Sequence, residues 1–123
     1  MISGHVNANR EAIIRLLVRD AAGQAQAIEA IIDTGFTGFL SLPSGLIAML
    51  GLAWRGHSQA VLADGGLHLF DVYAATVIWD GQVRTVETDA ADIEPVVGMG
   101  SIYEYDLRIQ AVNGGAVTLE LLP

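Results

Sequence analysis

Tight-turn signals recur along this chain between short apolar runs, and their spacing constrains the fold more than any other feature of the sequence. They stand at residues 20–23, 64–66, 80–81 and 113–115, and each begins with Asp or Asn and ends with Gly. Such segments favour the short connections of antiparallel strands. The pattern predicts an all-β chain, with strands at residues 12–19, 24–32, 58–63, 67–79, 82–88, 105–112 and 116–122.

The apolar run at residues 67–79 is long for a strand in a small sheet. It predicts a hairpin arm that extends beyond the body of the domain, with residues 58–63 as its partner and a glycine-rich tip at residues 64–66. One helix is expected after Leu42, because Pro43 suits a first helical position, Leu46 and Leu50 share an apolar face, and Gly51 ends the pattern. A second, very short helix is expected after residue 98.

Length and composition limit what the chain can do. Its 123 residues, 52% of them apolar, contain no Pro/Ser-rich linker, so we expect a single domain over residues 1–123. Cysteine and lysine are both absent, which excludes disulfides, thiol nucleophiles, thiolate metal sites and Schiff-base chemistry.

The 14 acidic side chains against 6 arginines give a formal net charge of -8, which disfavours nucleic acid and anionic membrane surfaces as partners and favours neutral or basic ones. No apolar run reaches the roughly 18 residues of a membrane span, and the first residues do not form an export signal. The sequence therefore predicts a cytoplasmic protein.

The most informative segment is Asp33-Thr34-Gly35, which follows an apolar strand and precedes a second apolar stretch. A carboxylate at the end of a buried strand is costly unless backbone N–H groups or a partner stabilise it. Gly35 allows a sharp turn that directs amides back at the Asp33 carboxylate, and the Thr34 hydroxyl can bridge to a neighbouring chain. An ordinary strand-ending turn is the alternative, but its apolar flanks argue for a site.

Residues 30–40 resemble the active-site loop of the retropepsin-like aspartic proteases, and Asp33-Thr34-Gly35-Phe36 resembles a small prokaryotic branch of that clan. Residues 94–99 resemble the element of two hydrophobic residues and a glycine that packs behind the catalytic loop. The hairpin with its tip at residues 64–66 resembles the flap that closes over a bound peptide; a plain hairpin is the alternative. The resemblance implies a single-lobe acid-protease barrel with a flap hairpin and one or two short helices.

The resemblance also implies peptide-bond hydrolysis with no cofactor and no metal. Two carboxylates then share one proton and hold a water, one acting as general base while the other polarises the substrate carbonyl. This chain has one Asp-Thr-Gly, so the second acid has to be Asp33 of another copy across a two-fold axis. The expectation is a homodimeric aspartic endopeptidase acting on an extended polypeptide, with Asp33 as the acid/base, Thr34 linking the two loops and Gly35 donating its N–H to the carboxylate.

Substrate contacts are expected from the flap tip and from hydrophobic subsites, at Ala63, Asp64, Gly65, Gly66, Phe36, Leu62 and Val97. The flap tip lacks a tyrosine and carries the charge of Asp64, which departs from familiar relatives. A retropepsin-like fold that dimerises or binds peptides without turnover is therefore the alternative function.

Other residues carry weaker signals. The three histidines His5, His57 and His68 lack metal-ligand spacing and are expected to be ordinary surface or strand residues. The acidic residues Glu87, Asp89, Asp92 and Glu94 are expected to form a solvated loop, with calcium binding as the less favoured alternative. By the same resemblance, residues 117–122 are expected to seal the dimer together with a thinner contribution from residues 1–2.

Overall fold

The structure, a computed structural model that describes residues 1–123, consists of ten strands and two short helices. The strands are β1 (Ile2–Val6), β2 (Ala12–Arg19), β3 (Ala25–Ile32), β4 (Leu40–Leu42), β5 (Ala53–Val61), β6 (Leu67–Trp79), β7 (Gln82–Ala90), β8 (Val96–Val97), β9 (Tyr105–Ile109) and β10 (Ala116–Leu121). The helices are α1 (Ser44–Leu50) and α2 (Met99–Ile102). The predicted all-β class is confirmed, and neither helix is long and apolar enough to cross a membrane.

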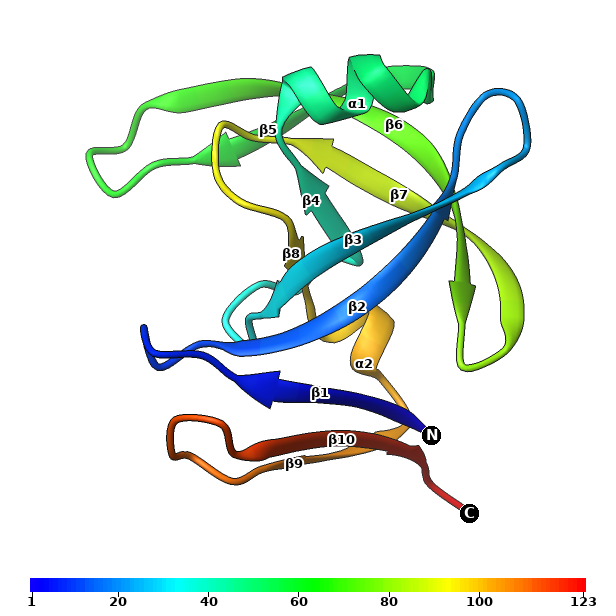
Figure 1. Ribbon diagram of the computed structural model, residues 1–123. Helices are drawn as coiled ribbons and strands as arrows, with labels where there is room; N and C mark the ends of the chain where they lie inside the picture. The colour runs from blue at the N-terminus through cyan, green and yellow to red at the C-terminus, as the bar shows by residue number, and fades with distance from the viewer.

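All ten strands belong to one sheet, in the order β5-β6-β7-β4-β8-β3-β2-β1-β10-β9. An additional pairing joins β6 to β2 at Leu17↔Ile78 and Val18↔Val77, so the sheet folds back on itself. Figure 1 shows α1 covering one end of the molecule and the β1, β10 and β9 strands at the other end. The hydrophobic core lies inside this curved sheet and includes Ile14 of β2, Leu40 and Leu42 of β4, and Ile47 of α1.

The four predicted turns are all present between strands. The turn between β6 and β7 is the tightest, because Asp80 and Gly81 both have positive φ angles, 51° and 78°. That conformation is required by a type I′ turn, and it sets the register Trp79↔Gln82 at the start of the β6–β7 pairing. The first turn is held by the Asp20 carboxylate, which accepts hydrogen bonds from the N–H groups of Ala22 and Gln24.

The predicted hairpin arm is also present. β5 and β6 pair from Ala53↔Ala74 to Val61↔Leu67, and their outer halves are exposed (Figure 1). β5 begins at Ala53 rather than at the predicted residue 58, because a bulge at Gly56, with φ 144°, lets the pairing continue past the irregularity.

Three strands were not predicted, namely β1, β4 and β8. β4 and β8 have three and two residues, too few for an alternating pattern to identify them. The two expected helices are present, but Pro43 is the residue before α1 (φ -61°, ψ 143°) rather than its first helical residue. Gly51, with φ 68°, ends α1 and donates its N–H to the carbonyls of Ile47 and Ala48.

The C-terminal strand, which was expected to seal the dimer, pairs with two strands of its own chain. β10 lies between β1 and β9, with Leu119 opposite Ile2 on one side and Leu107 on the other. Residues 116–119 of β10 are therefore paired with β1 and residues 117–121 with β9, so most of the strand is already paired within the chain. The open strand edge in this part of the sheet belongs to β9.

Candidate active site

The Asp33 loop follows directly from the buried end of β3. The Gly35 N–H donates to Oδ1 of Asp33 at 2.9 Å, which is the hydrogen bond expected from the sequence. The Asp33 N–H donates to the carbonyl of Val97 (2.9 Å), and the Phe36 N–H donates to the carbonyl of Asp33 (3.2 Å). Asp33, Thr34 and Gly35 are all exposed. The loop is thus held from behind while its carboxylate and hydroxyl face outwards.

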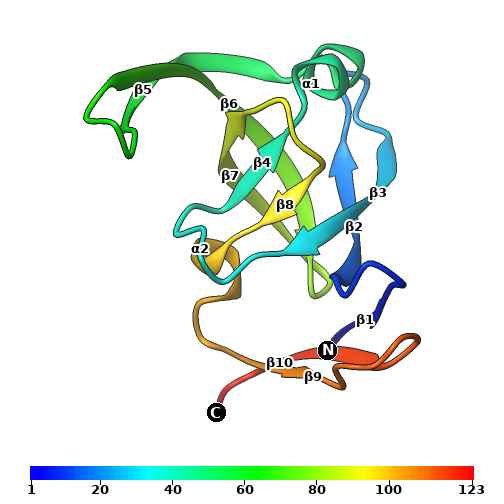
Figure 2. The same ribbon diagram turned by 90° about the vertical axis from the view of Figure 1, so that its left-hand side faces the viewer.

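β8 and α2 form the support behind this loop. β8 pairs in parallel with β3 (Ile32↔Val97) and antiparallel with β4 (Leu40↔Val97), and Figure 2 shows the three strands side by side with α2 below them. The residues that follow β8 bond to the loop itself, because the Met99 N–H donates to the carbonyl of Phe36 at 2.7 Å. Residues 94–99 therefore lie behind the Asp33 loop, where the sequence predicted them.

The ring of Phe36 fixes the shape of the loop against two glycines. A Cβ atom at Gly98 would lie 2.5 Å from Cδ2 of Phe36 and 2.6 Å from its carbonyl oxygen. A Cβ atom at Gly38 would lie 2.5 Å from Cζ of the same ring. Since carbon atoms in ordinary contact lie roughly 3.5–4 Å apart, neither position has room for a side chain. The glycine that follows Val96-Val97 is thus required for space.

A cavity of about 560 Å³ opens beside the loop, and we call it the Asp33 cavity. Three carboxylates line it, from Asp33, Asp89 and Asp92. The outer half of the β5–β6 hairpin contributes His68 and Phe70, whose rings stack with centroids 6.5 Å apart. The hairpin and the Asp33 loop therefore flank the same cavity.

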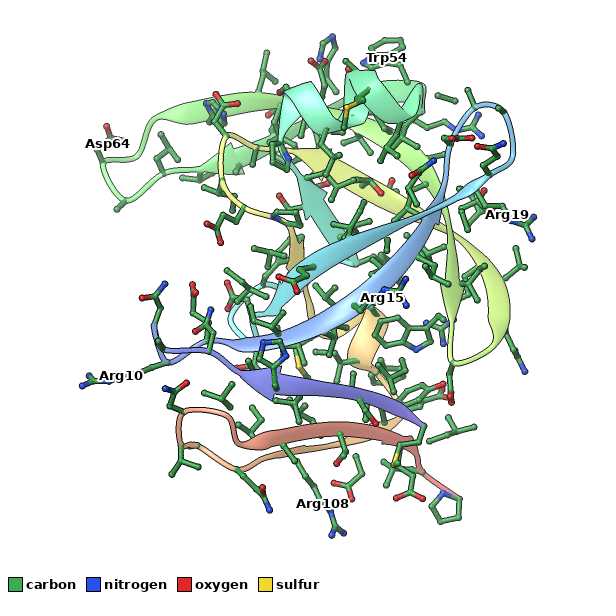
Figure 3. The ribbon with its side chains drawn as sticks, in the orientation of Figure 1. Arg10, Arg15, Arg19, Trp54, Asp64 and Arg108 are labelled. Atoms are coloured by element: carbon green, nitrogen blue, oxygen red, sulfur yellow. The ribbon has the colours of Figure 1, made fainter.

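Negative charge predominates among the side chains that line the Asp33 cavity. Burial raises the pKa of the Asp89 carboxyl, and the charge of Glu87 raises it further. None of the six arginines lines the cavity. In Figure 3, Arg19 and Arg108 lie at the right-hand edge and at the bottom of the molecule, far from the hairpin. Within the cavity, His68 is therefore the one basic side chain beside three carboxylates.

Of the three residues expected to form hydrophobic subsites, only one lines the Asp33 cavity. Phe36 lines the Asp33 cavity. Val97 is only 1% exposed and belongs to the core, and its neighbour Val96 lines the cavity in its place. Leu62 lies close to the exposed hairpin tip and does not line the cavity.

The tip of the hairpin is built as expected for a glycine-rich turn. Its residues Ala63, Asp64, Gly65 and Gly66 are all exposed, and Gly65 has φ 82°. The Asp64 carboxylate accepts a hydrogen bond from the Gly66 N–H at 2.8 Å, so its charge helps to hold the turn. Asp64 lies at the far end of the hairpin in Figure 3, away from the body of the molecule. These residues do not line the Asp33 cavity in this conformation.

Sequence reasoning missed several residues that line this cavity. Asp89 was expected in a solvated loop, but β7 extends through Ala90 and leaves Asp89 half-buried, so that expectation was wrong. Asp92 and Glu94 are exposed loop residues, as expected. The acidic residues do not form a group of three that could hold a metal ion.

Ser41 and Phe70 were also missed. Ser41 stands between two core leucines in β4, and that single polar residue was the available signal. In β6, His68 and Phe70 are two residues apart and therefore share one face of the strand. His68 was expected to be an ordinary surface or strand residue, and it is exposed in β6, but it also lines the cavity.

No protein-family model, curated protein or solved structure matches this chain. Its function has to be inferred from its own residues.

Proposed function

We propose that this chain is a retropepsin-like aspartic endopeptidase, active as a homodimer in the cytoplasm on extended polypeptides. The observation that carries the proposal is the Asp33 loop, in which an exposed carboxylate at the buried end of β3 accepts a hydrogen bond from the Gly35 N–H. An ordinary turn would not need β8 and α2 to hold it from behind by backbone hydrogen bonds.

The strand pairing supports the fold part of the proposal. The strands β6, β7, β4, β8, β3 and β2 each pair with the next, and β2 pairs back to β6. Such a cycle of pairings is what a single-lobe barrel requires. The outer half of the β5–β6 hairpin extends beyond this cycle of strands and flanks the Asp33 cavity, as a flap would.

The proposed chemistry needs two copies of the chain. The carboxylates of the two Asp33 residues would share one proton, because like charges roughly 3 Å apart cannot both ionise. One carboxylate takes a proton from the bound water as the water attacks the peptide carbonyl, and the other donates a hydrogen bond to the developing oxyanion. Collapse of the tetrahedral intermediate then breaks the C–N bond, and the amine leaves with a proton from the dyad.

The remaining loop residues have supporting roles in this proposal. The Gly35 N–H keeps its hydrogen bond to the carboxylate and orients it. The exposed Thr34 hydroxyl is free to bridge the two loops across the two-fold axis. Closure of the hairpin over the peptide would exclude water from the dyad, and the exposed backbone of its tip would bind the extended chain.

A peptide-binding or dimerisation module without turnover is the second candidate. Asp64 at the hairpin tip favours it, because a carboxylate held in that turn adds negative charge where a flap would meet its substrate. Such a module would keep the dimer and the bound peptide but would not hydrolyse it.

The test is to measure the mass in solution by sedimentation and the cleavage of an unfolded protein across acidic pH, with Asp33→Asn as the matched variant. We expect a dimer, cleavage by the wild type, and a loss of cleavage by about 10²-fold or more in Asp33→Asn with its fold and dimer retained. Undiminished cleavage by Asp33→Asn refutes the assignment. A dimer that cleaves nothing favours the binding module.

A further inference from the structure

The Asp33 cavity has three carboxylates and no arginine among its lining residues, and His68 is the one lining side chain with a basic nitrogen. Neither Asp89 nor Asp92 forms an ion pair within the chain. A half-buried carboxylate without a partner is costly, since it has lost part of its hydration and gained no opposite charge. Asp89 meets this description, and burial together with Glu87 raises its pKa. The cavity is therefore electrostatically suited to a ligand that brings its own positive charge.

Ser41 gives a second and independent sign of a missing ligand. Its residue is only 5% exposed, and its hydroxyl forms no hydrogen bond within the chain. Leu40 and Leu42 on either side point into the core, so the alternation of β4 directs Ser41 to the opposite face, towards the cavity. Its hydroxyl therefore has a hydrogen bond to offer to a group that enters the cavity. Ser41 and Asp89 are direct partners in the register between β4 and β7.

Apart from His68, the rest of the cavity wall is apolar. Phe36, Phe70, Ile93 and Val96 line it together with the polar residues. A small inorganic cation would leave this apolar surface uncovered, whereas a purely apolar side chain would leave the carboxylates and the hydroxyl unpaired. The combination fits an aliphatic stem that ends in a cation.

We propose that the Asp33 cavity binds the side chain of an arginine or lysine residue of the polypeptide, with its stem against Phe36 and Phe70 and its cation beside Asp89 and Ser41. This inference rests on the proposed function in one respect, because the proposed function is the reason to expect that the ligand is part of a polypeptide. It adds the class of residue that is recognised, and the net charge of -8 acts in the same direction by attracting basic segments.

The test uses four probe peptides, acetyl-Ala-Ala-Xaa-Ala-Ala-amide, with Arg, Lys, citrulline or Glu at Xaa. Citrulline keeps the size of arginine and removes its charge. Each peptide is titrated into the ¹⁵N-labelled full chain, and backbone amide shifts are followed by NMR. We expect the Arg and Lys peptides to shift the signals of Ser41, Asp89 and Ile93, and to bind about tenfold more tightly than the citrulline peptide.

Variants separate the cavity from the general negative charge of the protein. Asp89→Asn should abolish the preference for Arg over citrulline, and Ser41→Ala should weaken it. Glu120→Gln is the matched control, because it also removes one negative charge but changes an exposed residue of β10 outside the cavity. It should leave the preference unchanged.

The outcomes distinguish this inference from the proposed function. Equal binding of all four peptides, no binding, or shifts only outside the cavity overturn the inference, whether or not the protein cleaves polypeptides. Charge-dependent binding at the cavity supports it. If that binding occurs and no unfolded protein is cleaved, the inference stands and the endopeptidase proposal fails.

Discussion

The contact between Gly98 and the Asp33 loop allows one substitution to test how the candidate site is held. In Gly98→Ala, the new Cβ atom would lie 2.5 Å from Cδ2 of Phe36 and 2.6 Å from the carbonyl oxygen of Phe36. An ordinary contact needs roughly 3.5 Å, so the ring and the backbone together have to move by about 1 Å. The backbone of Gly98 itself is not the obstacle, because its φ of -103° suits any residue.

This displacement has a cost that follows from the packing. Overpacking a close contact typically costs about 1–3 kcal/mol, and here two of the contacted atoms, the carbonyl oxygens of Gly38 and Phe36, belong to backbone rather than to a flexible side chain. We therefore expect Gly98→Ala to lower the free energy of unfolding by about 2 kcal/mol or more, which corresponds to a fall in Tm of roughly 8 °C for a chain of this size. Urea and thermal unfolding followed by circular dichroism measure both quantities.

Gly45→Ala is the matched control. Gly45 lies in α1, and a Cβ atom there would meet nothing within 4 Å. Alanine is the better helix former, so this change should leave stability unchanged or raise it by up to about 1 kcal/mol. Equal stabilities for Gly98→Ala and the wild type would show that the loop is not held by this contact, and would refute the argument that the glycine is required for space.

Three further substitutions test separate contacts. Ser101→Ala removes the 2.8 Å hydrogen bond from the Ser101 hydroxyl to the carbonyl of Phe39 and should cost about 1 kcal/mol in urea unfolding; no loss would mean that the bond does not stabilise the loop. Asp71→Asn weakens the contacts that this carboxylate makes at the base of the β5–β6 hairpin and should speed amide hydrogen exchange in β5; unchanged exchange would contradict that role. Burial and the charge of Glu87 raise the pKa of Asp89 in the folded chain, so ionisation of Asp89 opposes folding. Asp89→Asn should therefore raise Tm at pH 7. This gain should disappear as the pH falls below 3.8, the ordinary pKa of an aspartate, which the unfolded chain retains. A Tm difference between Asp89→Asn and the wild type that does not change with pH would contradict a raised pKa of Asp89.

The strands and the Asp33 loop could be predicted because their signals are local. β2 and β6 were predicted with the bounds that the structure gives them, since each is a long apolar run between turn residues. The hydrogen bond from Gly35 to Asp33 was predictable for the same reason, because it joins residues two positions apart.

The cavity could not be predicted because it joins distant segments. Ser41 and Asp89 are 48 positions apart and face each other only because β4 pairs with β7. β4 has three residues and no pattern of its own, so nothing in the sequence indicated which strand it would join. Asp89 looked like a loop residue because it follows Glu87 in an acidic stretch, and only the length of β7 makes it half-buried.

The position of β10 was missed for a related reason. Residues 117–122 are apolar enough to pair with a second chain, and the sequence does not say whether their edges will be free. Most of their backbone pairs with β1 and β9, and only residues 1–2 of the N-terminal segment were expected to contribute there. The dimer proposed above would bring the exposed Asp33 loops of two copies together.

The central claim is that each active site needs Asp33 from two copies of the chain, and a subunit-mixing experiment tests it most directly. Wild type and Asp33→Asn are mixed in equal amounts, allowed to exchange subunits, and assayed for cleavage of an unfolded protein. If both carboxylates are required, only the wild-type dimers are active, and the activity per total chain falls to about a quarter of the wild-type value. An activity of about half would mean that each chain carries a complete site and would contradict the claim.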